Sequence, residues 1–138
     1  MSRKKEREYA LKGIFQLDFH TEPGDFSDSI AYFIEDNALD LDYGKTLIDA
    51  TESHLAEIDE ILDEYLKSTW KIDRIPKVEK SILRMAICEL LFMKEKVPFE
   101  VVINEAIELT KKFGDEDGKN YVNGILNKIV KDRQHVCP

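Results

Sequence analysis

The stretch ILRMAICELLFM, residues 82–93, decides the fold. Its only charged residues are Arg84 and Glu89, so a helix formed by this stretch has almost no polar face. A helix that is apolar around its whole circumference belongs in the centre of a protein. Pro76 suits the first turn of such a helix. The sequence therefore predicts a central, buried helix over residues 76–93.

Helical periodicity extends outward from this stretch in both directions. Apolar residues recur at helical spacing, and no stretch alternates apolar and polar residues for long. The spacing predicts five further helices. They begin near residues 4, 25, 42, 98 and 119, the first running over residues 4–20 and the third, the longest, over residues 42–67.

Residues 68–75 form the clearest linker. They divide the chain into two halves of three helices each, about residues 1–67 and 76–138. We expect the halves to pack intimately, because a chain of 138 residues is normally one domain. The sequence thus predicts an all-α fold, a compact helical bundle of two three-helix halves.

The composition excludes two classes of protein. With 43% hydrophobic and 35% charged residues, the chain is too apolar for an acidic disordered protein and too charged for a membrane protein. No export signal is visible, so we expect a cytoplasmic protein. Cys88 and Cys137 make no disulfide framework, and we interpret Cys88 as a core residue and Cys137 as a free thiol.

Charge is distributed unevenly along the chain. The formal net charge is −8, yet Lys and Arg outnumber Asp and Glu at the start. From Asp18 to Glu64 acids dominate, and Lys45 is the only base in that segment. We therefore predict one acidic and one basic face, and a basic face is compatible with nucleic acid.

Signs of catalysis are missing from the sequence. His20, His54 and His135 are scattered, and none has a second His or Cys at a metal-ligand spacing. No glycine-rich phosphate loop and no nucleophile elbow occurs. We expect no enzyme activity, no metal and no cofactor.

The basic N-terminus is the first feature that plain packing does not explain. Arg3, Lys4, Lys5 and Arg7 lie in the first turns of a helix, where cations oppose the helix dipole. They fit either a solvated, frayed helix start or contact with the phosphates of a nucleic acid.

Glu89 is the second such feature, because it stands alone on a nearly apolar helix. A carboxylate in that position must be paired, exposed through a gap, or available to a partner. We weigh an internal ion pair against a hydrogen-bonding point at a protein interface.

The third feature is KNYVNG, residues 119–124. If Val122 faces the core, Tyr121 faces elsewhere, and a tyrosine beside lysine and asparagine can stack on a base. The alternative is a helix start with a half-buried tyrosine. Gly124 is costly inside a helix, which suggests close helix packing.

The fourth feature is Trp70, which we interpret as a core residue between the halves rather than a ligand platform. The cations that follow it are candidates for extending a basic surface, namely Lys71, Arg74, Lys77 and Lys80.

Four stretches occur in an order that a known family shares. They are REYALKGIFQ at residues 7–16, ILRMAICEL at 82–90, VPFEVVINEAIELTKKFG at 97–114 and YVNGILNK at 121–128. Over most of its length, and most strongly over residues 70–128, the chain resembles the NusB family of bacterial transcription antitermination factors.

The resemblance implies an all-helical protein that binds boxA RNA as a heterodimer with NusE, a small-subunit ribosomal protein. The family's complex joins RNA polymerase and suppresses premature termination at ribosomal RNA operons. Two sets of residues are implicated. RNA contact is implied for Arg3, Lys4, Arg7, Asp117, Lys119, Asn120 and Tyr121, and NusE contact for Phe15 and Glu89.

Two departures from the family pattern affect these assignments. The start is poorer in arginine than is common in the family, which implies weak intrinsic RNA affinity. Phe15 stands where tyrosine is common, so one hydroxyl for the partner is absent.

Other functions remain as alternatives to this reading. The first is a helical protein-interaction module with no RNA role. The second, an RNA methyltransferase, would need a catalytic domain that these residues do not supply. Self-association through the partner face, as a homodimer, is also compatible with the sequence.

Overall fold

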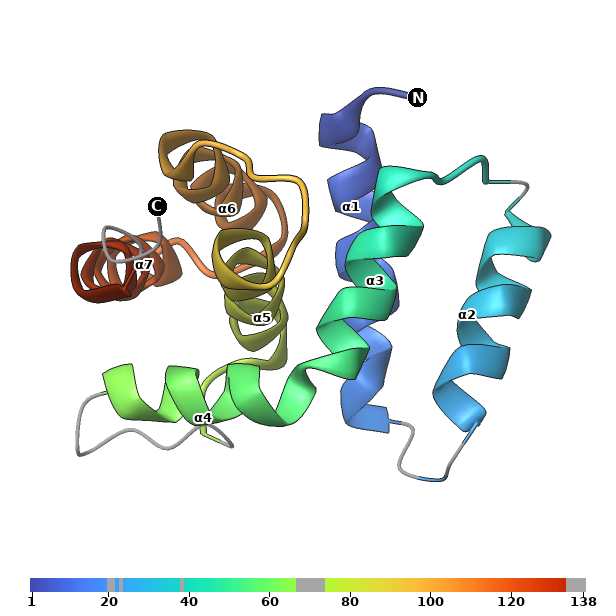
Figure 1. Cartoon of the computed structure of the whole chain (residues 1–138), viewed down its shortest axis with the longest axis horizontal. Coiled ribbons are helices and arrows are strands. Elements are labelled where there is room, and N and C mark those ends of the chain that lie inside the picture. The colour runs from blue at the N-terminus through green and yellow to red at the C-terminus, as the bar shows by residue number, and fades with distance from the viewer. Residues whose placement is uncertain (20–21, 23, 38, 67–73, 134–138) are drawn as a thin grey trace.

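The computed structural model describes residues 1–19, 22, 24–37, 39–66 and 74–133, and its regular elements are all helical, which confirms the all-α prediction (Figure 1). The elements are α1 (Arg3–Phe15), the 3-10 helix η1 (Gln16–Phe19), α2 (Asp25–Asp36), α3 (Tyr43–Ser53), α4 (Leu55–Tyr65), α5 (Lys77–Leu91), α6 (Phe99–Phe113) and α7 (Gly118–Arg133).

Helix α5 forms the centre of the molecule, as its composition predicts. Twelve of its fifteen residues are buried, and it packs against α1, α3, α4, α6 and α7. Figure 1 shows α5 between α6 and α7 on one side and α1 and α3 on the other. Ile82, Leu83 and Ile87 have no exposed surface, and each contributes roughly 1.5–3 kcal/mol through the hydrophobic effect.

The continuous third helix predicted over residues 42–67 is wrong. The chain breaks at His54, whose φ of −108° and ψ of 17° end α3 and begin α4. One turn earlier, the buried Thr51 hydroxyl donates a 2.7 Å bond to the carbonyl of Leu47, a bond that tends to bend helices. As a result α3 packs on α1 and α5, while α4 packs on α5 and α7.

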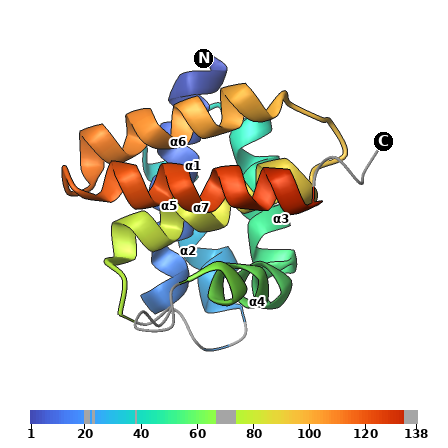
Figure 2. The ribbon, with the colours of Figure 1, turned by 90° about the vertical axis from the view of Figure 1, so that its left-hand side faces the viewer.

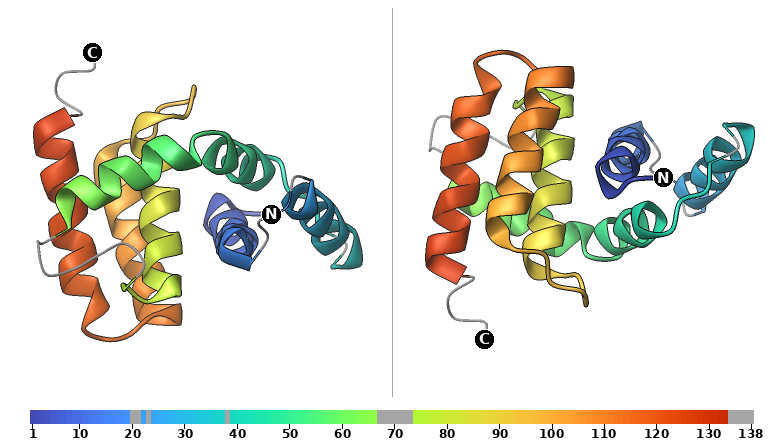
Figure 3. Two further views of the ribbon diagram at one scale, coloured as in Figure 1. Left: turned by 90° about the horizontal axis from the view of Figure 1, so that it is seen from below. Right: turned by 90° about the horizontal axis from the view of Figure 1, so that it is seen from above.

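Three helices of the first half approach one another closely at Gly13. A Cβ at Gly13 would lie 3.0 Å from Ile48 Cδ1 on α3 and 3.1 Å from Ile30 Cδ1 on α2. Figure 3 shows α1 between α2 and the α5–α7 group, with α2 at the outer edge of the molecule. The α-helical part of the first helix ends at Phe15, earlier than predicted, and η1 continues it to Phe19.

Helices α6 and α7 form an antiparallel pair over α5, and the N-terminal end of α1 emerges beside α6 (Figure 2). Cys88 is buried, as predicted, and burial raises the pKa of its thiol to about 11. No helix in the described residues is long and apolar enough to cross a membrane. Trp70, Lys71 and Cys137 lie outside the described residues, so their interpretations stay predictions.

Candidate nucleic-acid interface

The basic start of the chain is a capped helix rather than a frayed one. Ser2 is the N-cap of α1, and its Oγ accepts a 3.1 Å hydrogen bond from the backbone N–H of Lys5. Arg3, Lys4 and Lys5 are exposed. A defined helix therefore presents three cations at one end of the molecule.

Arg3 is held by two contacts at the surface. Its Nη1 lies 3.0 Å from Oε1 of Glu95, in the segment between α5 and α6. Its guanidinium carbon lies 4.0 Å from the centroid of the Tyr43 ring. The side chains of Arg3 and Glu95 remain 42% and 63% exposed, so an incoming anion can compete for Arg3.

Arg7 is part of a buried polar network that joins α1, α3 and α5. Its Nε and Nη2 donate bonds of 2.9 and 3.0 Å to the two carboxylate oxygens of Glu89. The hydroxyl of Tyr43 donates a 2.6 Å bond to the same carboxylate. Burial alone would lower the pKa of Arg7, but the bonds and charge of Glu89 outweigh it and raise that pKa.

Of the two interpretations of Glu89, the structure supports the internal ion pair, which Glu89 forms with Arg7. Arg7 and Glu89 are only 3% and 2% exposed. The expectation that Arg7 meets RNA phosphate at the surface is not met in this conformation, because its guanidinium is buried and its Nε and Nη2 are bound to Glu89. Glu89 is likewise buried where a partner contact would need it exposed.

Phe15 lies at the end of α1, two turns beyond Arg7 and its contact with Glu89. Its ring packs at 5.3 Å, tilted, against the ring of Phe19. Phe19 is 56% exposed, and the Lys77 ammonium lies 5.1 Å from its ring. The structure thus separates Phe15 from Glu89 and pairs Phe15 with an exposed aromatic residue that the sequence analysis missed.

Lys80 does not extend a basic surface, contrary to one of our interpretations. Its Nζ lies 3.0 Å from Asp18 Oδ2, and it is 7% exposed. Arg84 also pairs with Asp18, at 3.0 Å, and with Asp59, at 2.8 Å. Burial alone would raise the pKa of Asp18, but the bonds and charges of Lys80 and Arg84 lower it. Arg74 and Lys77 are exposed.

Glu8 connects α1 to the end of α6. Its Oε1 lies 2.6 Å from the Nζ of Lys112, and its Oε2 lies 3.4 Å from the Nζ of Lys5. Lys112 is followed directly by the turn at residues 114–118. This ion-pair cluster therefore joins the N-terminal half of α1 to the last turn of α6, which precedes the turn at residues 114–118.

The turn at residues 114–118 is supported by Glu79, which the sequence analysis did not single out. Glu79 is 1% exposed, and its Oε2 accepts a 3.1 Å bond from the backbone N–H of Asp115. A Cβ at Gly118 would lie 2.7 Å from that same oxygen. A side chain at position 118 would therefore displace the Glu79 carboxylate from its place at the turn, and the turn presents Asp117 on the surface.

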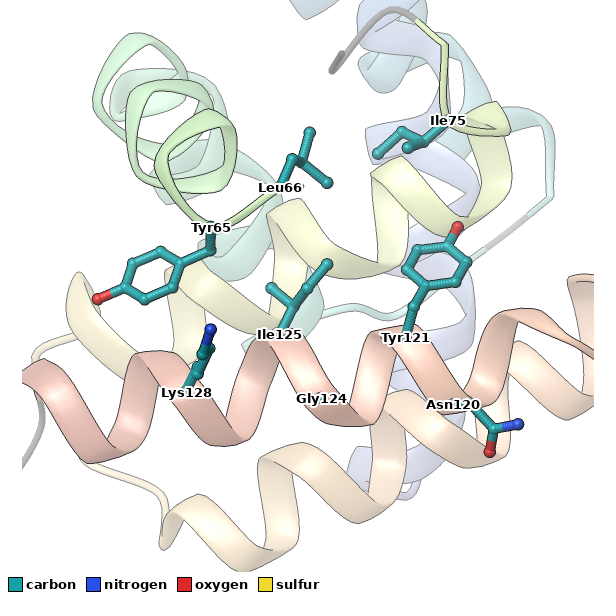
Figure 4. A pocket seen from close by; sticks show the side chains of 8 residues that line it. All are labelled: Tyr65, Leu66, Ile75, Asn120, Tyr121, Gly124, Ile125 and Lys128. Atoms are coloured by element: carbon teal, nitrogen blue, oxygen red, sulfur yellow. The ribbon is translucent and has the colours of Figure 1, made fainter. Parts of the chain in front are cut away.

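At the start of α7, neighbouring side chains point in different directions. Lys119 is half-buried and Asn120 is exposed, and Figure 4 shows Asn120 directed away from the ring of Tyr121. Tyr121 is half-buried, as the plainer of our two interpretations expects. Burial, with the charges of Glu79 and Asp115, raises the pKa of its hydroxyl.

The Tyr121 ring faces a hollow of about 540 Å³ between α4 and α7 (Figure 4). The lining includes Tyr65, Leu66, Ile75 and Gly124. Among the described residues, a Cβ at Gly124 would meet nothing within 4 Å. The interpretation that Gly124 permits close helix packing is therefore wrong, and the glycine instead widens this hollow.

Within the described residues, no group of three or more His, Cys, Asp or Glu side chains is placed to hold a metal ion. The titratable clusters are ion pairs that join helices. What the arrangement offers chemically is a set of cations and aromatic rings at the surface.

Comparison with known proteins gives one consistent family. The model of the NusB family matches residues 4–131. The transcription antitermination protein NusB of Natranaerobius thermophilus is 41% identical over 134 residues, which cover 94% of this chain and 95% of the relative. The NusB of Clostridium botulinum is 40% identical, with 95% and 99% covered.

Solved structures agree with this result. Thermotoga maritima NusB has a TM-score of 0.80 and 33% identity, over 97% of this chain and 94% of that one. A chain from the crystal structure of the antitermination factors NusB and NusE in complex with dsRNA has a TM-score of 0.78 and 31% identity. In that comparison 94% of this chain and 96% of the other are covered.

Proposed function

The chain belongs to the NusB family of transcription antitermination factors, and from this we propose that it binds boxA RNA as a heterodimer with NusE. The likeness to a chain crystallised with NusE and dsRNA carries the proposal. The assembled complex would join RNA polymerase in the cytoplasm and prevent premature termination at ribosomal RNA operons. The protein acts by binding, and we propose no catalysis.

We propose that RNA runs along α1 and α6, from the first turn of α1 to the turn at residues 114–118. Arg3 and Lys4 would contact phosphates, which attract exposed cations whatever the base sequence. Asp117 and Asn120 are exposed polar side chains that can read base edges, with Lys119 beside them. Tyr121 would stack on a base, since its ring lines an open hollow.

Arg7 takes a different role in this proposal. Because its guanidinium is bound to Glu89, it holds α1 against α5 and so fixes the direction in which the exposed cations of the first turn point. Arg7 is thus a positioning residue for RNA binding.

For NusE we propose the surface around Phe15 and Phe19 at the other end of α1. Phe19 offers an exposed aromatic ring, and such rings are enriched at protein interfaces. Glu89 would act on this surface indirectly, through the position of α1. A homodimer through the same surface is compatible with the proposal.

Binding of a boxA-containing RNA, with and without NusE, across a salt series tests the proposal. We expect sequence-dependent binding that needs NusE and weakens as salt rises, because phosphate contacts release counterions. A scrambled RNA of the same length is the control. The RNA role would be contradicted if the protein bound NusE but no RNA. It would also be contradicted if the RNA affinity did not change with salt concentration.

Either outcome would favour the protein-interaction module. One observation supports this alternative, since several surface cations already have carboxylate partners. Arg3 pairs with Glu95, Lys111 with Glu108, and Lys112 with Glu8.

A further inference from the structure

A hollow between α1 and α6 is lined by Lys111 and Lys112, two cations that the resemblance does not implicate, as well as by Lys4. It has a volume of about 270 Å³. Its charged lining residues are Lys4, Glu8, Glu105, Glu108, Lys111 and Lys112. Of these only Lys4 belongs to the set assigned to RNA on the family pattern.

Glu8 sits between the cations of this site in the manner of a bound anion. One carboxylate oxygen is bound by Lys112 from α6 and the other is within reach of Lys5 from α1. Glu8 is 8% exposed, whereas the side chains of Lys5 and Lys112 are 59% and 54% exposed. The lysines can therefore turn toward an external anion while the carboxylate stays in place.

We infer that the α1–α6 hollow is a phosphate-binding part of the RNA site, and that Glu8 occupies it in the free protein as an internal competitor. This inference rests on the proposed RNA-binding function. RNA phosphate and the Glu8 carboxylate compete for the same ammonium groups, of Lys112 above all. Binding of RNA then exchanges an internal ion pair for an intermolecular one, which lowers the affinity of the free protein.

The position of the hollow supports this inference. Lys112 precedes the turn at residues 114–118, and Lys4 belongs to the first turn of α1. The hollow thus lies between the two elements proposed to contact RNA. The hydrogen bond of Lys112 lowers the pKa of Glu8, so the competing carboxylate stays ionised at neutral pH.

A purely structural role for Glu8 predicts the opposite result. If the Glu8–Lys112 pair only clamps α6 to α1, removing its charge loosens the neighbouring turn and weakens RNA binding. If Glu8 competes with phosphate, removing its charge strengthens RNA binding. The sign of one change therefore separates the two roles.

The experiment measures boxA RNA binding by the NusE heterodimer for the wild type and for Glu8→Gln, which keeps the shape and one acceptor oxygen. We expect affinity to rise roughly two- to fivefold, the range measured for exposed ion pairs. The slope of affinity against salt should stay close to that of the wild type, because Lys112 contacts the same phosphate in both complexes. Thermal unfolding confirms that the variant is folded.

Asp49→Asn is the matched control for net charge, because Asp49 also lies 2.6 Å from a lysine, Lys45, but on α3. Glu8→Gln must strengthen binding more than this control. If the RNA affinity of Glu8→Gln rises no more than that of the control, or falls, Glu8 is not a competitor. The proposed function still holds in that case, provided that the wild type binds RNA. Absence of RNA binding by both wild type and Glu8→Gln, with NusE bound, overturns both.

Lys112→Gln provides an independent measurement if Glu8→Gln does not fold. We expect this variant to bind RNA with a salt dependence shallower by about 0.7, because one phosphate contact is lost. A weaker affinity with an unchanged salt dependence would assign Lys112 to the clamp alone and overturn the inference.

Discussion

Helix α1 carries two arginines four residues apart that have opposite roles. Arg7 and Glu89 have side chains 4% and 2% exposed, whereas those of Arg3 and Glu95 are 42% and 63% exposed. In both pairs nitrogen and oxygen are about 3 Å apart. Burial, and not the distance between charges, therefore decides whether an ion pair holds the fold or remains available to a ligand.

The largest expected effect comes from breaking the buried pair. Glu89→Ala leaves the Arg7 guanidinium charged and uncompensated, which costs about 3–5 kcal/mol of the free energy of unfolding. Chemical denaturation measures this loss. Replacing both residues by methionine should cost less, because no unpaired charge is left. A Glu89→Ala protein of wild-type stability that fails to bind NusE would instead make Glu89 a direct partner contact.

Tyr121 is half-buried, so its burial is intermediate between that of the Arg7–Glu89 pair and that of the Arg3–Glu95 pair. Tyr121→Ala should weaken RNA binding by about 1–3 kcal/mol, the range for loss of one stacked base, and leave NusE binding intact. Binding of labelled RNA by the heterodimer measures it. Tyr121→Phe is the control, since it keeps the ring. Unchanged RNA affinity in a folded Tyr121→Ala variant would remove the ring from the RNA site.

Asp18 is another largely buried carboxylate, and its contribution to the free energy of unfolding should be lost in acid. Its pKa lies below the ordinary 3.8 because of Lys80 and Arg84. A lowered pKa adds stability that is present above the ordinary value and is lost as pH falls through the folded-state value. The free energy of unfolding should therefore depend on pH in this range more steeply for the wild type than for Asp18→Asn. Identical pH profiles would show that the ion pairs of Asp18 add nothing.

The smallest effect on stability belongs to the exposed pair. Arg3→Ala should change the free energy of unfolding by less than about 1 kcal/mol, the usual worth of a surface ion pair. RNA binding, in contrast, should weaken and depend less on salt. Thermal unfolding and a salt series measured on one preparation separate these two effects. A large loss of stability would mean that the stacking of Arg3 on Tyr43 contributes to the core.

The parts of the fold that follow from local composition were predictable. The apolar circumference of residues 82–93 is enough by itself to place α5 at the centre. The break at His54 was not predictable, because apolar residues continue at helical spacing on both sides of it. The bend becomes evident only in the tertiary structure, where α3 packs on α1 and α4 packs on α7.

The candidate site was predictable in its residue types but not in its pairings. Glu89 stands out on an apolar helix, yet nothing local shows that its partner is Arg7, 82 residues away. Glu79 gave no signal, because its role depends on a turn that tertiary packing brings to it. The prediction of close helix packing at Gly124 failed for the same reason. A glycine inside a helix indicates an unusual environment, but the sequence does not show whether that environment is crowded or open.

The long separation between Arg7 and Glu89 has a consequence for folding during synthesis. Helix α1 leaves the ribosome first, but its buried arginine must wait for 82 further residues before its carboxylate exists. At about 5–20 residues per second, the wait lasts several seconds. Once α3 (Tyr43–Ser53) has been translated, α1 has Tyr43 and α3 as native neighbours, but it still lacks α5. The first-made helix thus reaches its final packing only after the central helix has been translated.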